Sequence, residues 1–126
     1  MAPIFNDIAK AKYILLTTFT KDGTPKPTAI WAAPDGDRLL VITEQDSWKV
    51  RRIRNTPRVT VAVCDPRGNP KSEPVEAVAR VLDKSEAADV QRAINKRYGV
   101  LGWLFGVYTK VRGLDKKSVG VEIKAA

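Results

Sequence analysis

Short segments in which apolar and polar residues alternate, separated by turn residues, constrain the fold of this chain more than any other feature. The first, residues 13–20, ends at Lys21-Asp22-Gly23-Thr24, and an Asp-Gly pair is a strong signal for a tight turn between two strands. Further strands are expected over residues 25–33 and 38–43, with a second turn between them. The sequence therefore predicts a meander of three antiparallel strands at the start of the chain.

The same alternation returns in the second half of the chain, over residues 58–64, 75–82 and 117–124. Two other segments have the spacing of helices. Residues 48–54 follow Asp46-Ser47, either of which can cap a helix, and residues 85–98 repeat apolar side chains at helical intervals after Ser85 as a cap.

With 126 residues, the chain has room for one domain and one core, so we expect a single domain over residues 1–126. About six antiparallel strands with two or three short helices make a mainly β (α+β) fold, a small barrel. Such a barrel is filled by its own side chains, so a ligand would bind outside it, where two copies of the chain meet. The apolar run 100–108 also favours association, but its glycines leave helix and strand open there.

Composition excludes several kinds of chemistry. Histidine is absent and Cys64 is the single cysteine, which removes Ser-His-Asp and Cys-His catalysis and the usual zinc sites. We therefore predict no catalytic side chain and no metal, and expect a cofactor to carry any reaction. A net charge of +8 indicates an anionic partner whose kind the charge leaves open.

The location expected from the sequence is the cytoplasm. The first residues lack the features of a secretory signal, no apolar run reaches the roughly 20 residues of a membrane span, and one cysteine suits a reducing interior. We expect no association with membranes. We also expect no binding of nucleic acid, because no strand interleaves aromatic and basic residues.

Residues 46–54 are the most informative segment. A strand runs into a helix whose N-terminus favours an anion; Ser47 can donate a hydroxyl, and Lys49 and Arg52 belong to a strongly basic helix. The same pattern is typical of a solvated basic helix with an ordinary cap. The residues themselves leave a phosphate site and a solvated helix both open.

The strand over residues 25–33 offers a second candidate surface. Trp31 presents a flat ring that can pack either against an aromatic cofactor or into the core. Pro25 and Pro27 cannot donate ladder hydrogen bonds, so this strand is expected at a sheet edge or a bulge. Exposed backbone groups there could pair with the heteroatoms of a ring.

Two stretches resemble the pyridoxamine 5′-phosphate oxidase-like superfamily. The first is Leu15-Leu16-Thr17-Thr18-Phe19 with Lys21-Asp22-Gly23-Thr24-Pro25 and Ile30-Trp31, and the second runs from Val41-Ile42-Thr43 through Asp46-Ser47-Trp48-Lys49-Val50-Arg51-Arg52-Ile53-Arg54 to Val59. More narrowly, the second stretch resembles the actinobacterial flavin/deazaflavin oxidoreductases that use coenzyme F420.

This resemblance implies a split β-barrel of the FMN-binding type and a homodimer with cofactor sites at its interface. It implies that a reduced deazaflavin, F420, transfers a hydride to a small organic acceptor. The cofactor phosphate would contact the strand end and the basic helix, and the ring would lie along the second strand. The residues so implied are Pro27, Thr28, Ala29, Ile30, Trp31, Ile42, Thr43, Ser47, Trp48, Lys49 and Arg52.

Three other functions stay open beside the F420-dependent reductase. An FMN-dependent oxidoreductase would share the fold, and its cofactor has one phosphate and needs fewer cations than the polyanionic F420. A non-catalytic protein that carries the cofactor would share the binding site. A small basic barrel that binds nucleic acid would also account for the positive net charge of the chain.

Overall fold

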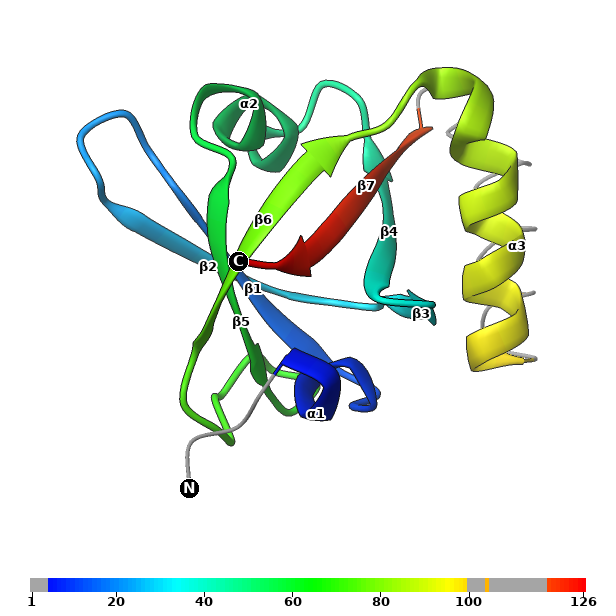
Figure 1. Ribbon diagram of the computed structural model, residues 1–126, viewed down its shortest axis with the longest axis horizontal. Helices are drawn as coiled ribbons and strands as arrows, with labels where there is room; N and C mark the ends of the chain where they lie inside the picture. Colours follow the sequence, from blue (N-terminus) through cyan, green and yellow to red (C-terminus); the bar gives the residue numbers. More distant parts are fainter. Residues whose placement is uncertain (1–4, 100–103, 105–117) are drawn as a thin grey trace.

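The computed structural model describes residues 5–99, 104 and 118–126, and within them seven antiparallel strands form one sheet (Figure 1). The strands are β1 (Ile14–Phe19), β2 (Pro25–Ile30), β3 (Ala33–Asp35), β4 (Arg38–Glu44), β5 (Arg58–Val63), β6 (Val75–Val81) and β7 (Ser118–Ala125). The helices are α1 (Phe5–Ala9), α2 (Trp48–Asn55) and α3 (Ala87–Tyr98), the last preceded by the 3-10 turn η1 (Lys84–Glu86).

The sheet curls into a split barrel because its two outermost strands follow each other in the chain. The strand order is β2-β1-β5-β6-β7-β4-β3, and only Trp31 and Ala32 separate β2 from β3. The single strand predicted over residues 25–33 is thus broken: its first part pairs with β1 and its second part with β4. This break adds the seventh strand, and the predicted barrel is confirmed.

The barrel interior is made by one face of each long strand, as the alternation predicts. In β4, Leu39 and Val41 point into the barrel, while Leu40 and Ile42 belong to clusters on its outside. Burying an aliphatic side chain of this size contributes about 1.5–3 kcal/mol. The other large aliphatic side chains that the strands contribute to the interior are Ile14, Leu16, Ile30, Val59, Val61, Val121 and Ile123.

Two helices lie at opposite ends of the barrel in Figure 1. Phe5 and Ile8 of α1 join the interior cluster at one end, and Ile53 of α2 joins it from the other. The sequence patterns predicted α2 but not α1, which is a helix of five residues.

The third helix packs on the outside of the barrel, against β3, β4 and β7. Val90, Ile94 and Tyr98 form its buried face. The close approach to β7 depends on Gly120, because a Cβ there would lie 2.7 Å from the Val90 Cγ2. The prediction of Ser85 as the cap was wrong: the Asp83 carboxylate accepts from the Ser85 backbone N–H and caps η1 instead.

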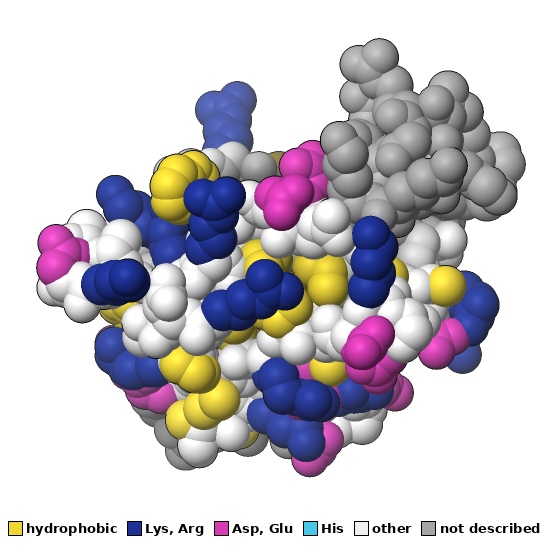
Figure 2. All heavy atoms as spheres, turned by 90° about the horizontal axis from the view of Figure 1, so that it is seen from above, with side chains coloured by type: hydrophobic (Ala, Val, Ile, Leu, Met, Phe, Trp, Pro, Cys, Tyr) yellow, Lys and Arg dark blue, Asp and Glu magenta, His cyan; other side chains and the backbone are white. Residues whose placement is uncertain are grey.

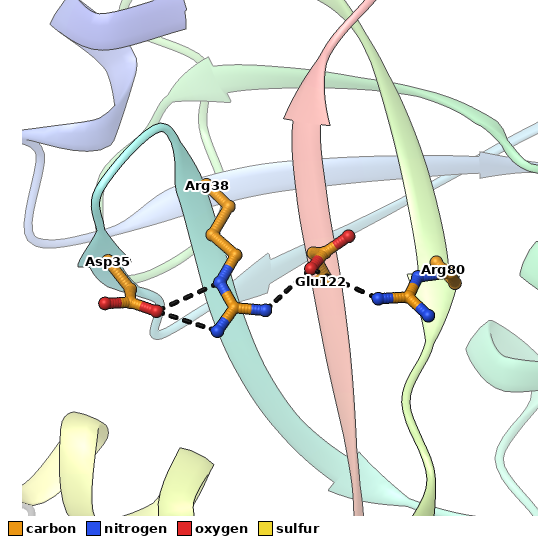
Figure 3. A network of polar contacts seen from close by, with 4 residues as sticks. All are labelled: Asp35, Arg38, Arg80 and Glu122. Carbon is orange, nitrogen blue, oxygen red and sulfur yellow. Dashed lines mark hydrogen bonds and ion pairs between the residues drawn. The ribbon is translucent and has the colours of Figure 1, made fainter. Parts of the chain in front are cut away.

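An ion-pair network crosses the outer face of four strands (Figure 3). The Glu122 side chain of β7 is 9% exposed and accepts from the Arg38 guanidinium at 2.6 Å and the Arg80 guanidinium at 3.4 Å. Arg38 also pairs with Asp35 at 2.8 Å. Burial alone would raise the pKa of the Glu122 carboxyl, but the hydrogen bonds from Arg38 and Arg80 outweigh it and hold that pKa below its ordinary value.

None of the helices in the described part of the chain is long and apolar enough to span a membrane. The apolar run 100–108, for which the sequence leaves the structure open, lies outside the described residues except for the exposed Leu104.

Candidate functional site

The N-terminus of α2 is built as the sequence predicts. Ser47 is its cap and accepts from the Val50 backbone N–H at 3.4 Å, at the long end of a hydrogen bond. Val50 and Ile53 are buried against the barrel and hold the helix there. The basic side chains of α2 consequently occupy its remaining faces, and Figure 2 shows Lys and Arg side chains spread over this side of the molecule.

Beside α2 lies an open cavity of about 320 Å³, within the size range of small-molecule sites. Five of the residues predicted for the cofactor site line it: Ala29, Ile30, Trp31, Ile42 and Lys49. The cavity thus joins the end of β2, the middle of β4 and the first turn of α2, which are separated in the sequence.

Among the described residues that line the cavity, Lys49 is the one charged side chain. No described carboxylate pairs with it. Burial lowers the pKa of the Lys49 ammonium, the charge of Arg52 lowers it further, and the charge of Glu44 opposes them only in part. Among the described residues no ion pair balances this charge, and an anion bound in the apolar cavity would supply the countercharge.

The indole of Trp31 is held by α3. Its ring stacks on the phenol of Tyr98, with centroids 4.6 Å apart and the planes 11° from parallel. Trp31 is half-buried and lines the cavity as well, so it lies between Tyr98 and the open space. Trp31 therefore packs against Tyr98 and also lines the cavity, and its contact with a cofactor ring stays a prediction.

Six other predicted site residues do not line this cavity. Trp48 differs most: it is 66% exposed, and the Arg51 and Arg52 guanidinium groups lie over its ring, 5.0 Å and 6.0 Å from the centroid. The remaining five belong to β2, β4 and α2 with its cap, the elements that contribute lining residues, and are Pro27, Thr28, Thr43, Ser47 and Arg52.

Four lining residues were missed by the sequence reasoning: Tyr13, Val41, Pro66 and Ile94. Tyr13 precedes Ile14, which pairs with Ile30 and so lies beside the end of β2. Ile94 was assigned to a helix face by its spacing, and that spacing could not tell which strand it would meet. The hairpin predicted for residues 13–33 places Tyr13 beside the end of the second strand, so the sequence could have identified it as a lining residue. Nothing in the sequence pointed to Pro66.

Comparisons with solved structures support the fold. A conserved hypothetical protein of Mycobacterium tuberculosis is 24% identical over 95% of this chain and 76% of its own, with a TM-score of 0.67. A structure named F420 reductase is 23% identical over 97% of this chain and 93% of its own, with a TM-score of 0.62. A FAD-binding protein of Mesorhizobium loti is 16% identical over 96% of this chain and 86% of its own, with a TM-score of 0.64.

No curated protein matches the chain in sequence. A family profile does: that of pyridoxamine 5′-phosphate oxidase matches residues 4–126, which is nearly the whole sequence. Together with the split barrel and the cavity beside α2, this match assigns the chain to the pyridoxamine 5′-phosphate oxidase family.

Proposed function

We propose that this protein is an oxidoreductase that binds the deazaflavin F420 and, with it, reduces a small organic acceptor. The observation that carries this proposal is the cavity that brings the Trp31 indole of the β2 end together with the Lys49 ammonium of α2. An aromatic wall and an adjacent cation without an ion pair among the described residues match a ligand that has a flat ring system and an acidic group. The solved structure named F420 reductase shares the fold, which adds support.

The cavity and its surroundings suit such a cofactor. Trp31, Ile30 and Ile42 offer apolar contact to a ring, and Lys49 offers charge to a phosphate. Ser47 caps the N-terminus of α2 and Arg52 lies in its last turn; both are proposed to complete the phosphate contacts. Arg51 and Arg54 lie exposed on that helix, where an anionic tail that leaves the cavity would meet them.

When bound, the deazaflavin supplies the hydride chemistry. The side chains of this chain are proposed to hold the ring, to screen it from water with the apolar wall of the cavity, and to neutralise the phosphate. Proposed contacts of the ring with Pro27 and Thr28, and of the phosphate with Thr43 and Trp48, lie next to the cavity lining.

FMN is a second candidate, on a specific observation. Lys49 is the one cation among the described lining residues, which suits a cofactor with a single phosphate. F420 is favoured by the density of basic residues on α2 outside the cavity.

The proposal includes a homodimer in the cytoplasm. Val78 of β6 is 47% exposed on the outer face of the sheet, where a second copy of the chain would cover it. Cys64 is buried and unpaired, which suits a reducing compartment.

Titration of the purified protein with F420 and with FMN, followed by cofactor fluorescence, tests this function. We expect saturable binding to one of them, and duplex DNA serves as the anionic control. Tight DNA binding with a steep salt dependence, and no response to either cofactor, would identify a nucleic-acid-binding barrel instead. A protein that binds F420 but never oxidises its reduced form with a broad panel of acceptors is a carrier.

The double variant Lys49→Ala, Arg52→Ala tests the phosphate contacts. It should weaken cofactor binding by about 2–5 kcal/mol if each residue makes a charged hydrogen bond. The matched control is Arg51→Ala, Arg54→Ala, measured with FMN, which has no anionic tail; it removes the same charge from exposed positions of the same helix. Equal losses in the two double variants would show general attraction to a basic surface, and unchanged affinity in a folded first variant would place the anion elsewhere.

A further inference from the structure

Tyr98, the last residue of α3, connects three parts of the molecule that meet at the cavity. Its ring covers one face of the Trp31 indole. Its hydroxyl accepts from the Ala32 backbone N–H at 3.0 Å, and its proton goes to the carbonyl of Lys12 at 2.8 Å or of Ala32 at 3.1 Å. Tyr98 thus holds α3, the segment before β1 and the break between β2 and β3 together.

Two of these contacts are to Ala32, one of the two residues at which the edge of the sheet turns. Trp31 and Ala32 lie between β2 and β3, and the pairing of β2 with β1 and of β3 with β4 does not extend over them. Ala32 is fully buried, and the Tyr98 hydroxyl serves its backbone groups in the way that a neighbouring strand would otherwise do. Burial raises the pKa of the Tyr98 phenol, so the hydroxyl keeps its proton and remains a donor.

Tyr98 does not itself line the cavity, but two of its neighbours do. Trp31 lies against its ring, and Ile94 lies one helical turn before it on the same face of α3. Any ligand that touches Trp31 therefore rests on a ring whose plane is set from behind by Tyr98.

On the basis of the function proposed above, we propose that Tyr98 is a positioning residue for the cofactor ring. It acts through Trp31: the stacked phenol sets the orientation of the indole, and the hydroxyl fixes the backbone that carries it. The cavity wall is then preorganised before the cofactor binds. Because the Trp31 side chain is already held in place, binding does not have to restrict its rotation, which would cost free energy.

Two variants separate the two parts of this role. Tyr98→Phe keeps the stacked ring and removes the three hydrogen bonds, whereas Tyr98→Leu removes both. The matched control is Val90→Ala, two turns earlier on the same helix; Val90 is 2% exposed, packs over Gly120 and does not line the cavity. Val90→Ala loosens α3 without touching Trp31.

Binding of F420 and of FMN, and the near-ultraviolet circular dichroism of the unliganded protein, are measured for each variant. We expect Tyr98→Leu to weaken binding by about 2-fold to 12-fold, the equivalent of one aromatic pair, and to reduce the dichroism of the stacked rings. Tyr98→Phe should retain most of the dichroism and lose less affinity. Val90→Ala should lower the melting temperature and leave both affinity and dichroism unchanged.

A double-mutant cycle with Trp31→Leu completes the test. If Tyr98 acts through Trp31, then Tyr98→Leu adds little to the loss already caused by Trp31→Leu. Fully additive losses, or a loss in Val90→Ala equal to that in Tyr98→Leu, would overturn the positioning role. These results differ from failure of the proposed function, in which the unmodified protein binds neither cofactor.

Discussion

The ion-pair network around Glu122 makes a quantitative prediction about which of its arginines stabilises the fold. Glu122 is almost enclosed, with 9% of its side chain exposed, and Arg38 donates to it at 2.6 Å while being 29% exposed. Arg80 is 67% exposed and 3.4 Å away. Distance and burial both indicate that the Arg38 contact is the stronger of the two.

The magnitudes follow from these environments. A hydrogen bond to a charged group in a partly buried site contributes about 1.5–3 kcal/mol, whereas an exposed ion pair contributes about 0–1 kcal/mol. Arg38→Met should therefore lower the free energy of unfolding by about 1.5–3 kcal/mol and Arg80→Met by less than about 1 kcal/mol. Arg38→Met also removes the ion pair between Arg38 and Asp35. The variant Asp35→Asn measures the contribution of that more exposed pair separately.

Urea denaturation at pH 7 and at acid pH checks both values and their sign. The pKa of Glu122 is held below its ordinary value in the folded protein, so its stabilisation is complete above the unfolded pKa. It is lost as the pH falls through the folded value. The stability difference between the unmodified protein and Glu122→Gln should thus shrink on acidification. Equal losses for Arg38→Met and Arg80→Met, or a difference that does not change with pH, would refute this reasoning.

Three further predictions concern the site and the core. Burial lowers the pKa of Lys49, so affinity for an anionic cofactor should fall as the pH rises through that pKa and Lys49 loses its charge. Lys49→Arg should move this loss of affinity to higher pH, and cofactor titrations across a pH series check both expectations. Gly120→Ala places a Cβ against the Val90 Cγ2 and should destabilise the protein by about 1–3 kcal/mol, measured by thermal melting. The Thr18 hydroxyl is buried without a partner among the described residues, so the nearly isosteric Thr18→Val should raise the melting temperature.

Much of the barrel could be predicted because it depends on local signals. The Asp22-Gly23 turn is present, with Gly23 at a positive φ of 88°, and Leu39 and Leu40 face opposite sides of β4 as the alternation requires. The prolines of β2 lie in an edge strand, as predicted, because a proline has no backbone N–H to donate to a neighbouring strand.

The break at Trp31–Ala32 could not be predicted, because no turn residue marks it. The chain leaves β2 there because the curled sheet brings the next residues to β4, and because Tyr98, 66 residues later, hydrogen-bonds to Ala32. Such long-range causes leave no local pattern. For the same reason the sequence identified Lys49 and Trp31 singly but could not show that one cavity joins them.

The direct passage from β2 into β3 also affects how the molecule opens. These strands stand at opposite ends of the strand order, yet two residues connect them, so neither edge can separate from its neighbour without straining the other. Their backbone amides should therefore exchange with solvent deuterium as one cooperative unit rather than fray independently. Since Trp31 lies within that unit and lines the cavity, opening of the sheet edges should also change access to the cavity.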